Sequence, residues 1–245
     1  MDRFTIAGVL NSIQNYFDID NATSGLLQTA FICSYMIFAP VFGFLGDRYS
    51  RKIIIIFGVL FWSLMTLLSS FVESHHTLLF FVFRALVGIG EASYSTVAPT
   101  IIADLFSGKK RSTMIAFFYF AIPVGSGLGY IVGSQMARIF GSWQFALRFT
   151  PLFGLISIIC YLFVKEPKRG AIDGDRQNVA YQNNTPSNFR ETMNSVRADI
   201  LYLLSVPSYM WTTFGFTAVC FSIGALSWWA PYFMMRAIVD SSEER

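Results

Sequence analysis

Residues 84–91, Arg84-Ala-Leu-Val-Gly-Ile-Gly-Glu91, place two charged side chains inside an otherwise apolar run over residues 78–103. Seven residues make nearly two helical turns, so Arg84, Gly88 and Glu91 share one helix face. A charge that faced lipid at the centre of a membrane would be costly, and this face is therefore expected to look into the protein or into a water-filled path. The structural alternative is a buried Arg–Glu pair that only locks helices together.

The composition of the chain is that of a membrane protein. Of its 245 residues, 54% are hydrophobic and 13% are charged, which is too apolar for a soluble protein of this length. Its basic residues gather in short connections, so the net charge of +3 reports orientation in a bilayer, and no nucleic-acid partner is expected. The three cysteines are scattered through apolar runs, which suits neither disulfides nor a zinc site. We expect no metal and no cofactor.

The apolar runs predict an all-α protein with seven membrane spans. The first, up to about Phe17, is too short to cross about 30 Å of hydrocarbon, so we expect that its N-terminal half is missing. Five more spans complete a bundle over residues 1–164, at residues 26–45, 53–72, 78–103, 113–137 and 145–164. Residues 165–206 read as a cytoplasmic linker, with an amphipathic surface helix over 189–204. Residues 207–245 carry the seventh span, the first helix of an incomplete second bundle.

The distribution of basic residues orients the bundle. The connections after the second and fourth spans and the linker hold most of the lysines and arginines, whereas the opposite connections hold only Arg138 and Arg148. The positive-inside rule places the basic connections in the cytoplasm. From the helical rise, Asp2 and Glu91 then lie at similar depths, roughly 17–20 Å from the outer ends of their spans.

Asp2, Arg3 and Glu91 are therefore expected to meet near the midplane, with Arg84 about two helical turns further out. A carboxyl that desolvation pushes towards its neutral form, and that an arginine pulls towards its anion, suits a proton carrier. Protonation of Glu91 or Asp2 would release Arg3 and shift the balance between inward-open and outward-open states. The alternative is a static network of ion pairs.

The connection between the second and third spans has the features of a cytoplasmic latch. It offers a glycine at a close approach of two helices, an acid at a helix end, and basic residues that can hold neighbouring carbonyls: Gly43, Asp47, Arg48, Arg51 and Lys52. Positive-inside orientation alone would account for Arg51 and Lys52, but not for Gly43 or Asp47.

Small residues and a proline mark two spans as sites of helix packing and gating. In a bilayer, glycines allow close helix contact and a proline allows a bend. The residues assigned to this role are Gly88, Gly90, Pro123, Gly125, Gly127, Gly129 and Gly133.

These segments resemble signatures of the major facilitator superfamily. Residues 43–52 look like the loop signature between its second and third helices, residues 84–90 resemble the RxxxGxG signature of its fourth, and residues 121–129 are similar to its fifth-helix motif. More narrowly, four stretches resemble the spinster branch, at residues 1–8, 46–52, 84–94 and 120–127. Ser50 stands where the wider superfamily usually has glycine, a departure that spinster relatives share.

The resemblance implies twelve helices in two bundles, alternating access, and proton-linked export of lysophospholipids, sphingosine or sphingosine-1-phosphate. It assigns Asp2, Arg3 and Glu91 to proton coupling, and Asp47, Arg48 and Arg51 to the cytoplasmic latch. The full-length protein is expected to be a monomer in the late endosomal or lysosomal membrane, with the plasma membrane as the other candidate. By this comparison five C-terminal helices lie outside the chain, which as a fragment is not expected to transport by itself.

Three other classes of function fit the sequence less well. A transporter for a sugar or small polar solute would need more hydrogen-bonding residues on the pore faces. A heptahelical receptor would explain the Asp47-Arg48-Tyr49 triplet only if one more span were lost, and it leaves the Arg84/Glu91 face without a role. An enzyme has no support, because the sequence offers no catalytic residues: no membrane-embedded histidine cluster, no paired aspartates across two helices and no Ser/His arrangement at matching depth.

Overall fold

The computed structural model describes residues 2–164, 167, 198 and 200–243. The chain falls into two units, Met1–Ile172 and Asp173–Arg245, whose boundary lies within the predicted linker. The surface helix predicted over residues 189–204 falls mostly outside the described residues. The described residues form helices and no strands, which confirms the all-α prediction.

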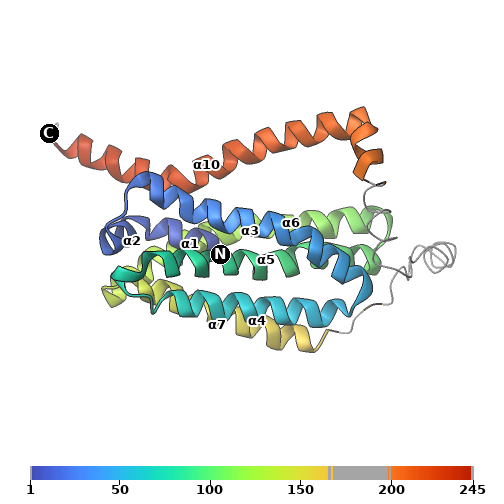
Figure 1. The fold of residues 1–245 in the computed structure, drawn as a ribbon, viewed down its shortest axis with the longest axis horizontal. Coiled ribbons are helices and arrows are strands. Elements are labelled where there is room, and N and C mark those ends of the chain that lie inside the picture. The colour runs from blue at the N-terminus through green and yellow to red at the C-terminus, as the bar shows by residue number, and fades with distance from the viewer. Residues whose placement is uncertain (1, 165–166, 168–197, 199, 244–245) are drawn as a thin grey trace. The chain divides into compact units, whose positions relative to one another are not determined.

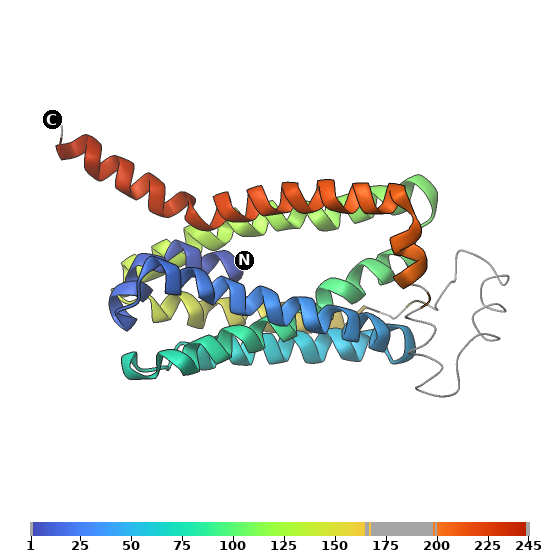
Figure 2. The same cartoon turned by 45° about the horizontal axis from the view of Figure 1, so that its top comes forward.

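The first unit is a bundle of long helices (Figure 1). Its elements in chain order are α1 (Asp2–Gly8), α2 (Leu10–Phe17), α3 (Asn21–Arg48), α4 (Arg51–Ser69), the 3₁₀ helix η1 (Ser74–His76), α5 (Thr77–Leu105), α6 (Gly108–Phe140) and α7 (Gln144–Leu162). The second unit contains α10 (Pro207–Glu243), which bends along its length (Figure 2). Within the described parts of the chain, six helical segments are long and apolar enough to cross a membrane.

Several helices extend beyond the apolar runs that predict them. Helix α3 begins at Asn21 because Asp20 caps it, with the carboxylate accepting a 2.9 Å hydrogen bond from the backbone N–H of Thr23. Helix α6 begins at Gly108 and so includes basic residues that the sequence assigns to a loop. Hydropathy identifies the part of a helix that lies inside the hydrocarbon, but it does not detect the polar helical turns that continue into the headgroup region.

The first span is not one continuous helix. Val9 separates α1 from α2 with φ −120° and ψ 18°, outside the helical region. Beside it Gly8 lies against α6, where a Cβ would stand 3.1 Å from the carbonyl oxygen of Tyr130. The glycine is therefore required by a close helix contact, whereas no sequence pattern predicts the break itself.

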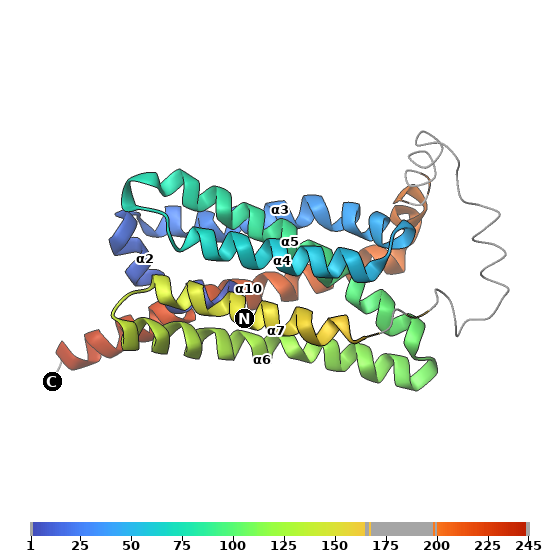
Figure 3. The same cartoon turned by 90° about the horizontal axis from the view of Figure 1, so that it is seen from below.

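Helix α5 is the central helix of the bundle, packed along both α3 and α4 (Figure 3). A Cβ on Gly88 would stand 2.4 Å from the carbonyl oxygen of Phe31 in α3, and one on Gly90 would stand 2.9 Å from the backbone nitrogen of Trp62 in α4. Only glycine fits at either position, because the atoms in the way belong to backbone or to its first side-chain carbon.

The close approach near the α3–α4 turn lies at Gly46 and not at Gly43. No atom lies within 4 Å of a Cβ built on Gly43, whereas one on Gly46 would stand 2.9 Å from a methyl carbon of Val97 in α5. Residues three apart on a helix point about 60° away from each other, so the signature alone does not tell which glycine faces the neighbour. The prediction that Gly43 forms the close contact is therefore wrong.

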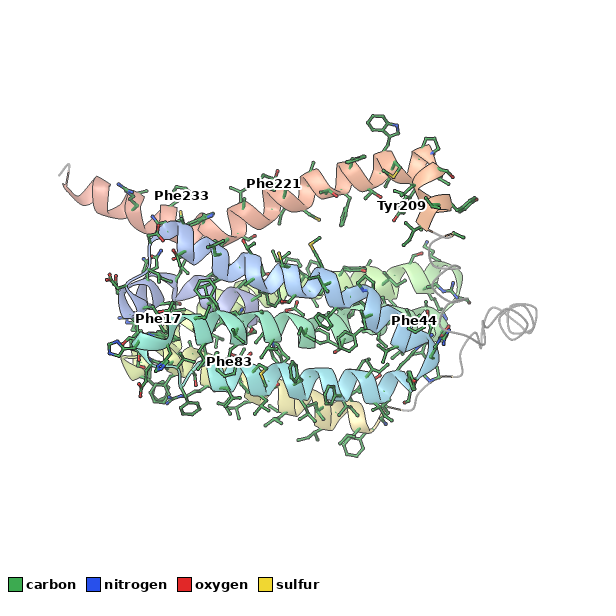
Figure 4. The ribbon with its side chains drawn as sticks, in the orientation of Figure 1. Phe17, Phe44, Phe83, Tyr209, Phe221 and Phe233 are labelled. Carbon is green, nitrogen blue, oxygen red and sulfur yellow. The ribbon has the colours of Figure 1, made fainter. Side chains whose placement is uncertain are left out.

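Phe17 and Phe44 lie at opposite ends of the bundle (Figure 4). At the end that holds α2, Phe17, Phe80 and Trp143 pack with ring centroids 4.9 to 5.9 Å apart. Phe44 marks the other end, beside the α3–α4 turn. With the basic connections in the cytoplasm, the three-ring cluster of Phe17, Phe80 and Trp143 lies at the outer end.

Candidate functional site

Four charged side chains from two helices form two ion pairs inside the bundle. Nη1 of Arg84 donates to Oδ2 of Asp2 at 3.3 Å, and Nη2 of Arg3 donates to Oε1 of Glu91 at 2.8 Å. Asp2 and Arg3 are consecutive on α1, whereas Arg84 and Glu91 stand two turns apart on α5. The two α1 residues therefore each pair with a different turn of α5.

The two ion pairs differ in their access to solvent. The side chains of Asp2 and Arg84 are 3% and 1% exposed, whereas those of Arg3 and Glu91 are 30% and 18% exposed. A charge in the dry interior is tolerated only when it is paired, because an isolated buried ion pays its full desolvation penalty. Asp2–Arg84 is thus the buried pair, and Arg3–Glu91 is the partly exposed pair.

This pairing departs from the sequence-based interpretation. The sequence suggested that either carboxyl would release Arg3 on gaining a proton, but Asp2 bonds to Arg84, and only Glu91 holds Arg3. Consecutive residues on a helix point about 100° apart, so the side chains of Asp2 and Arg3 bind different partners. Arg84 joins the cluster through Asp2 and not through Glu91, from which it is separated by about 10 Å along the helix axis.

A phenyl ring from α3 contacts both arginines. Phe31 is fully buried, and its ring centroid lies 4.7 Å from Cζ of Arg3 and 5.7 Å from Cζ of Arg84. Both distances fall within the range of about 6 Å over which a cation is attracted to the face of an aromatic ring. Sequence analysis missed Phe31, because one phenylalanine among many in an apolar run carries no distinguishing signal.

Hydroxyl groups continue the site from Glu91 towards the cytoplasmic end. Ser95 is one turn further along α5 and donates to the backbone carbonyl of Glu91 at 2.8 Å and to the hydroxyl oxygen of Tyr35 at 3.1 Å. Tyr35 belongs to α3, so this contact links α3 and α5 beside the partly exposed ion pair of Arg3 and Glu91.

A second charged cluster ties together the helix ends beside the α3–α4 turn. Arg51, at the start of α4, forms a salt bridge with Asp104 near the end of α5. Nε of Arg51 also donates to the backbone carbonyl of Gly46 at 3.3 Å, so one side chain joins α3, α4 and α5. Asp104 was not among the residues that the sequence analysis selected, although a lone acid beside a basic loop was a usable signal.

The remaining latch residues lie around the same turn. Nζ of Lys52 donates to the carbonyl oxygens of Leu162 and Val164, each at 2.7 Å, and so caps the end of α7 where helical carbonyls lack partners. The guanidinium of Arg48 lies 4.3 Å from the ring centroid of Phe44. Asp47 is exposed in the last turn of α3.

The small residues of α6 divide between two faces. Gly129 and Gly133 are buried, and a Cβ on Gly133 would stand 2.8 Å from the carbonyl oxygen of Thr5 in α1. Pro123 and Gly127 are exposed, Gly125 is half-buried, and no atom lies within 4 Å of a Cβ built on Gly127. Within the first unit, Gly127 therefore has no packing role of the kind that its sequence predicts.

Nearly the whole length of the chain is similar to curated relatives. It is 54% identical to Protein spinster homolog 1 of Xenopus laevis over 238 residues, which make up 97% of this chain and 43% of that protein. It is 50% identical to the human Protein spinster homolog 1 over 244 residues, covering 99% and 44%, and 53% identical to Protein spinster of Drosophila melanogaster over 234 residues, covering 96% and 36%. The chain thus spans less than half of the length of these relatives.

Solved structures share the fold. A bacterial homolog to the human lysosomal transporter Spinster, in an inward-facing and occupied conformation, superposes with a TM-score of 0.61 at 25% identity, covering 73% of this chain and 44% of that one. A proton:xylose symporter bound to 6-bromo-6-deoxy-D-glucose superposes with a TM-score of 0.56 at 20% identity, covering 67% and 41%.

The sequence model of the Major Facilitator Superfamily matches residues 1–240. The match takes in α1 and α5, whose facing charges form the two ion pairs, and the turn between α3 and α4. Because six helices in its described residues can cross a bilayer, the chain is a multi-pass integral membrane protein. It belongs to the major facilitator superfamily, and among its relatives are the spinster proteins.

Proposed function

We propose that the protein containing this bundle is a proton-coupled secondary transporter that exports lysophospholipids, sphingosine or sphingosine-1-phosphate by alternating access. The observation that carries the proposal is the pair of ion bridges between α1 and α5, of which one is dry and one is open to water. The lipid class rests on the similarity to spinster proteins, and membership of the superfamily supports secondary transport.

The proton step follows from the difference between the two pairs. Glu91 is accessible to water and holds Arg3, so a proton arriving at this carboxyl neutralises it and leaves Arg3 without its anionic partner. The Asp2–Arg84 pair is buried and keeps α1 attached to α5 throughout. A released Arg3 changes the balance between inward-open and outward-open states, because the two states offer it different partners.

The substrate would bind beside the same groups. A released guanidinium attracts an anionic or zwitterionic headgroup, and the hydroxyls of Tyr35 and Ser95 lie next to it for hydrogen bonding. The apolar tail would lie along hydrophobic helix faces. At the cytoplasmic end, the Arg51–Asp104 bridge and the contacts of Lys52 would form a latch that holds in one of the two states.

Neither alternative gains support. The xylose symporter shares the fold alone, and the described hydroxyls near Glu91 are few for a sugar, so a transporter for small polar solutes remains the second candidate. Membership of a transporter superfamily disfavours the heptahelical receptor. We propose that the full-length protein is a monomer in the late endosomal or lysosomal membrane, because the bacterial structure is that of a homolog to a human lysosomal transporter. The plasma membrane is the alternative location.

Transport by the full-length protein in proteoliposomes tests this function. Labelled lysophosphatidylcholine and sphingosine-1-phosphate would be supplied under an imposed pH gradient, with a labelled sugar as the comparison. Glu91→Gln is expected to abolish the response to the gradient, whereas Glu73→Gln, at an exposed acid outside the helix core, should keep it. Uptake that still responds to pH in Glu91→Gln would refute the proton site, and uptake of the sugar alone would refute the lipid class.

A further inference from the structure

We infer that Phe31 is a positioning residue of the proton site, whose ring is the partner that remains to Arg3 when Glu91 becomes neutral and releases it. The inference rests on the proposed function for its meaning in transport, but its evidence is geometric. Phe31 is the contact that Arg3 and Arg84 have in common, since both guanidiniums lie within cation–π distance of its ring.

The position of the ring is fixed by the packing of the backbone. The carbonyl of Phe31 lies against Gly88, with only 2.4 Å to the place where a Cβ would stand. Gly88 is one turn from Arg84 and about one turn from Glu91 on the same face of α5. The ring is fully buried and lies beside the two charged turns of α5, within reach of both arginines.

The ring of Phe31 and the carboxylate of Glu91 both attract the guanidinium of Arg3. Each arginine in the observed state has an acid as its first partner and the ring as its second. When Glu91 gains a proton, Arg3 loses the attraction of the acid, but the negative face of the ring remains. Arg3 can then settle closer over the ring, so the ring stabilises the proton-bound state more than it stabilises the ion-paired state.

Other ionisable groups surround the site and have to be kept constant in any test. Those on the helices packed around Phe31 are Asp2 and Arg3 of α1, Tyr35 of α3, Arg84, Glu91 and Tyr94 of α5, and Tyr130 of α6. Phe31→Leu leaves every one of them in place and removes only the aromatic face.

Infrared spectroscopy on the chain in lipid nanodiscs measures this effect without any transport. The band of the protonated Glu91 carboxyl is identified by its disappearance in Glu91→Gln and is then followed as a function of pH. In Phe31→Leu we expect the midpoint of the pH profile to move by about one unit towards acid, a tenfold loss of proton affinity that corresponds to about 1.4 kcal/mol. Phe31→Tyr should keep the wild-type midpoint.

Phe80→Leu is the matched control, because Phe80 is an equally buried phenylalanine of the bundle that packs on Phe17 and Trp143. Among the described residues, no arginine lies over its ring. It should leave the midpoint unchanged. Replacement of Phe31 by phenylalanines of increasing fluorination keeps the ring and weakens its negative face, so the midpoint should move stepwise even if Phe31→Leu does not fold.

The outcomes separate the inference from the function on which it rests. An unchanged midpoint in Phe31→Leu and in the fluorinated series overturns the role of Phe31 and leaves the proton site intact. A shift of the same size in Phe80→Leu also overturns it, since general loosening of the bundle would then be the cause. The absence of any pH-dependent Glu91 band in the wild type would instead refute the proton site itself.

Discussion

Gly88→Ala tests how closely the proton site depends on helix contact. The added Cβ would stand 2.4 Å from the carbonyl oxygen of Phe31, 3.2 Å from its carbonyl carbon and 3.3 Å from the backbone nitrogen of Tyr35. Ordinary carbon contacts need about 3.5 Å or more, so α3 and α5 have to separate by about 1 Å at this point. Overpacking of this kind costs about 1–3 kcal/mol, and we expect the upper part of the range because backbone has to move.

Reversible unfolding in mixed micelles with increasing SDS measures the loss of stability. Gly43→Ala is the control in a neighbouring helix, because no atom lies within 4 Å of its new methyl group, and its stability should stay within about 0.5 kcal/mol of the wild type. If Gly88→Ala proved as stable as Gly43→Ala, the α3–α5 contact would not have the tightness on which the placement of Phe31 depends.

Three further predictions concern charged residues. Asp2→Ala should destabilise the bundle by about 3–5 kcal/mol in the same SDS assay, because the buried charge of Arg84 loses its ion-pair partner. The double variant Asp2→Ala/Arg84→Leu should recover more than half of this loss in stability. Lys52→Met should speed hydrogen exchange in the last turn of α7, while Lys109→Met, at an exposed lysine on the same side, should not. Hydrogen bonds from Thr23 lower the pKa of Asp20 below its usual 3.8. The cap therefore stabilises α3 above pH 3.8, and this stabilisation is lost as the pH falls through the lowered pKa. An NMR titration of the Thr23 amide with a midpoint at or above 3.8 would contradict this prediction.

The sequence predicted that charges from α1 and α5 would lie at one depth, and the reason is general. Ionisable groups in apolar runs have to find partners, and the rise of a helix converts residue number into depth. The choice of partner was not accessible in this way. Whether Asp2 or Arg3 meets Glu91 depends on the rotation of α1 about its own axis, which is set by its contacts with α6 at Gly8 and Gly133.

Packing residues were predicted less well than charged ones. Glycine is recognisable in a helix, but the face that it occupies depends on the neighbour, and the sequence therefore selected Gly43 where Gly46 makes the contact. Phe31 illustrates the other limit. A phenylalanine in a membrane span gives no sign that it lies against two cations until the helices around it are placed.

The break in helical geometry at Val9 divides the first span into two pieces. The outer piece, α2, is anchored by the rings of Phe17, Phe80 and Trp143, whereas the inner piece of seven residues bears the acid and the base that bind α5. The two pieces of the first span are therefore held by different kinds of contact, the outer piece by stacked rings and the inner piece by ion pairs.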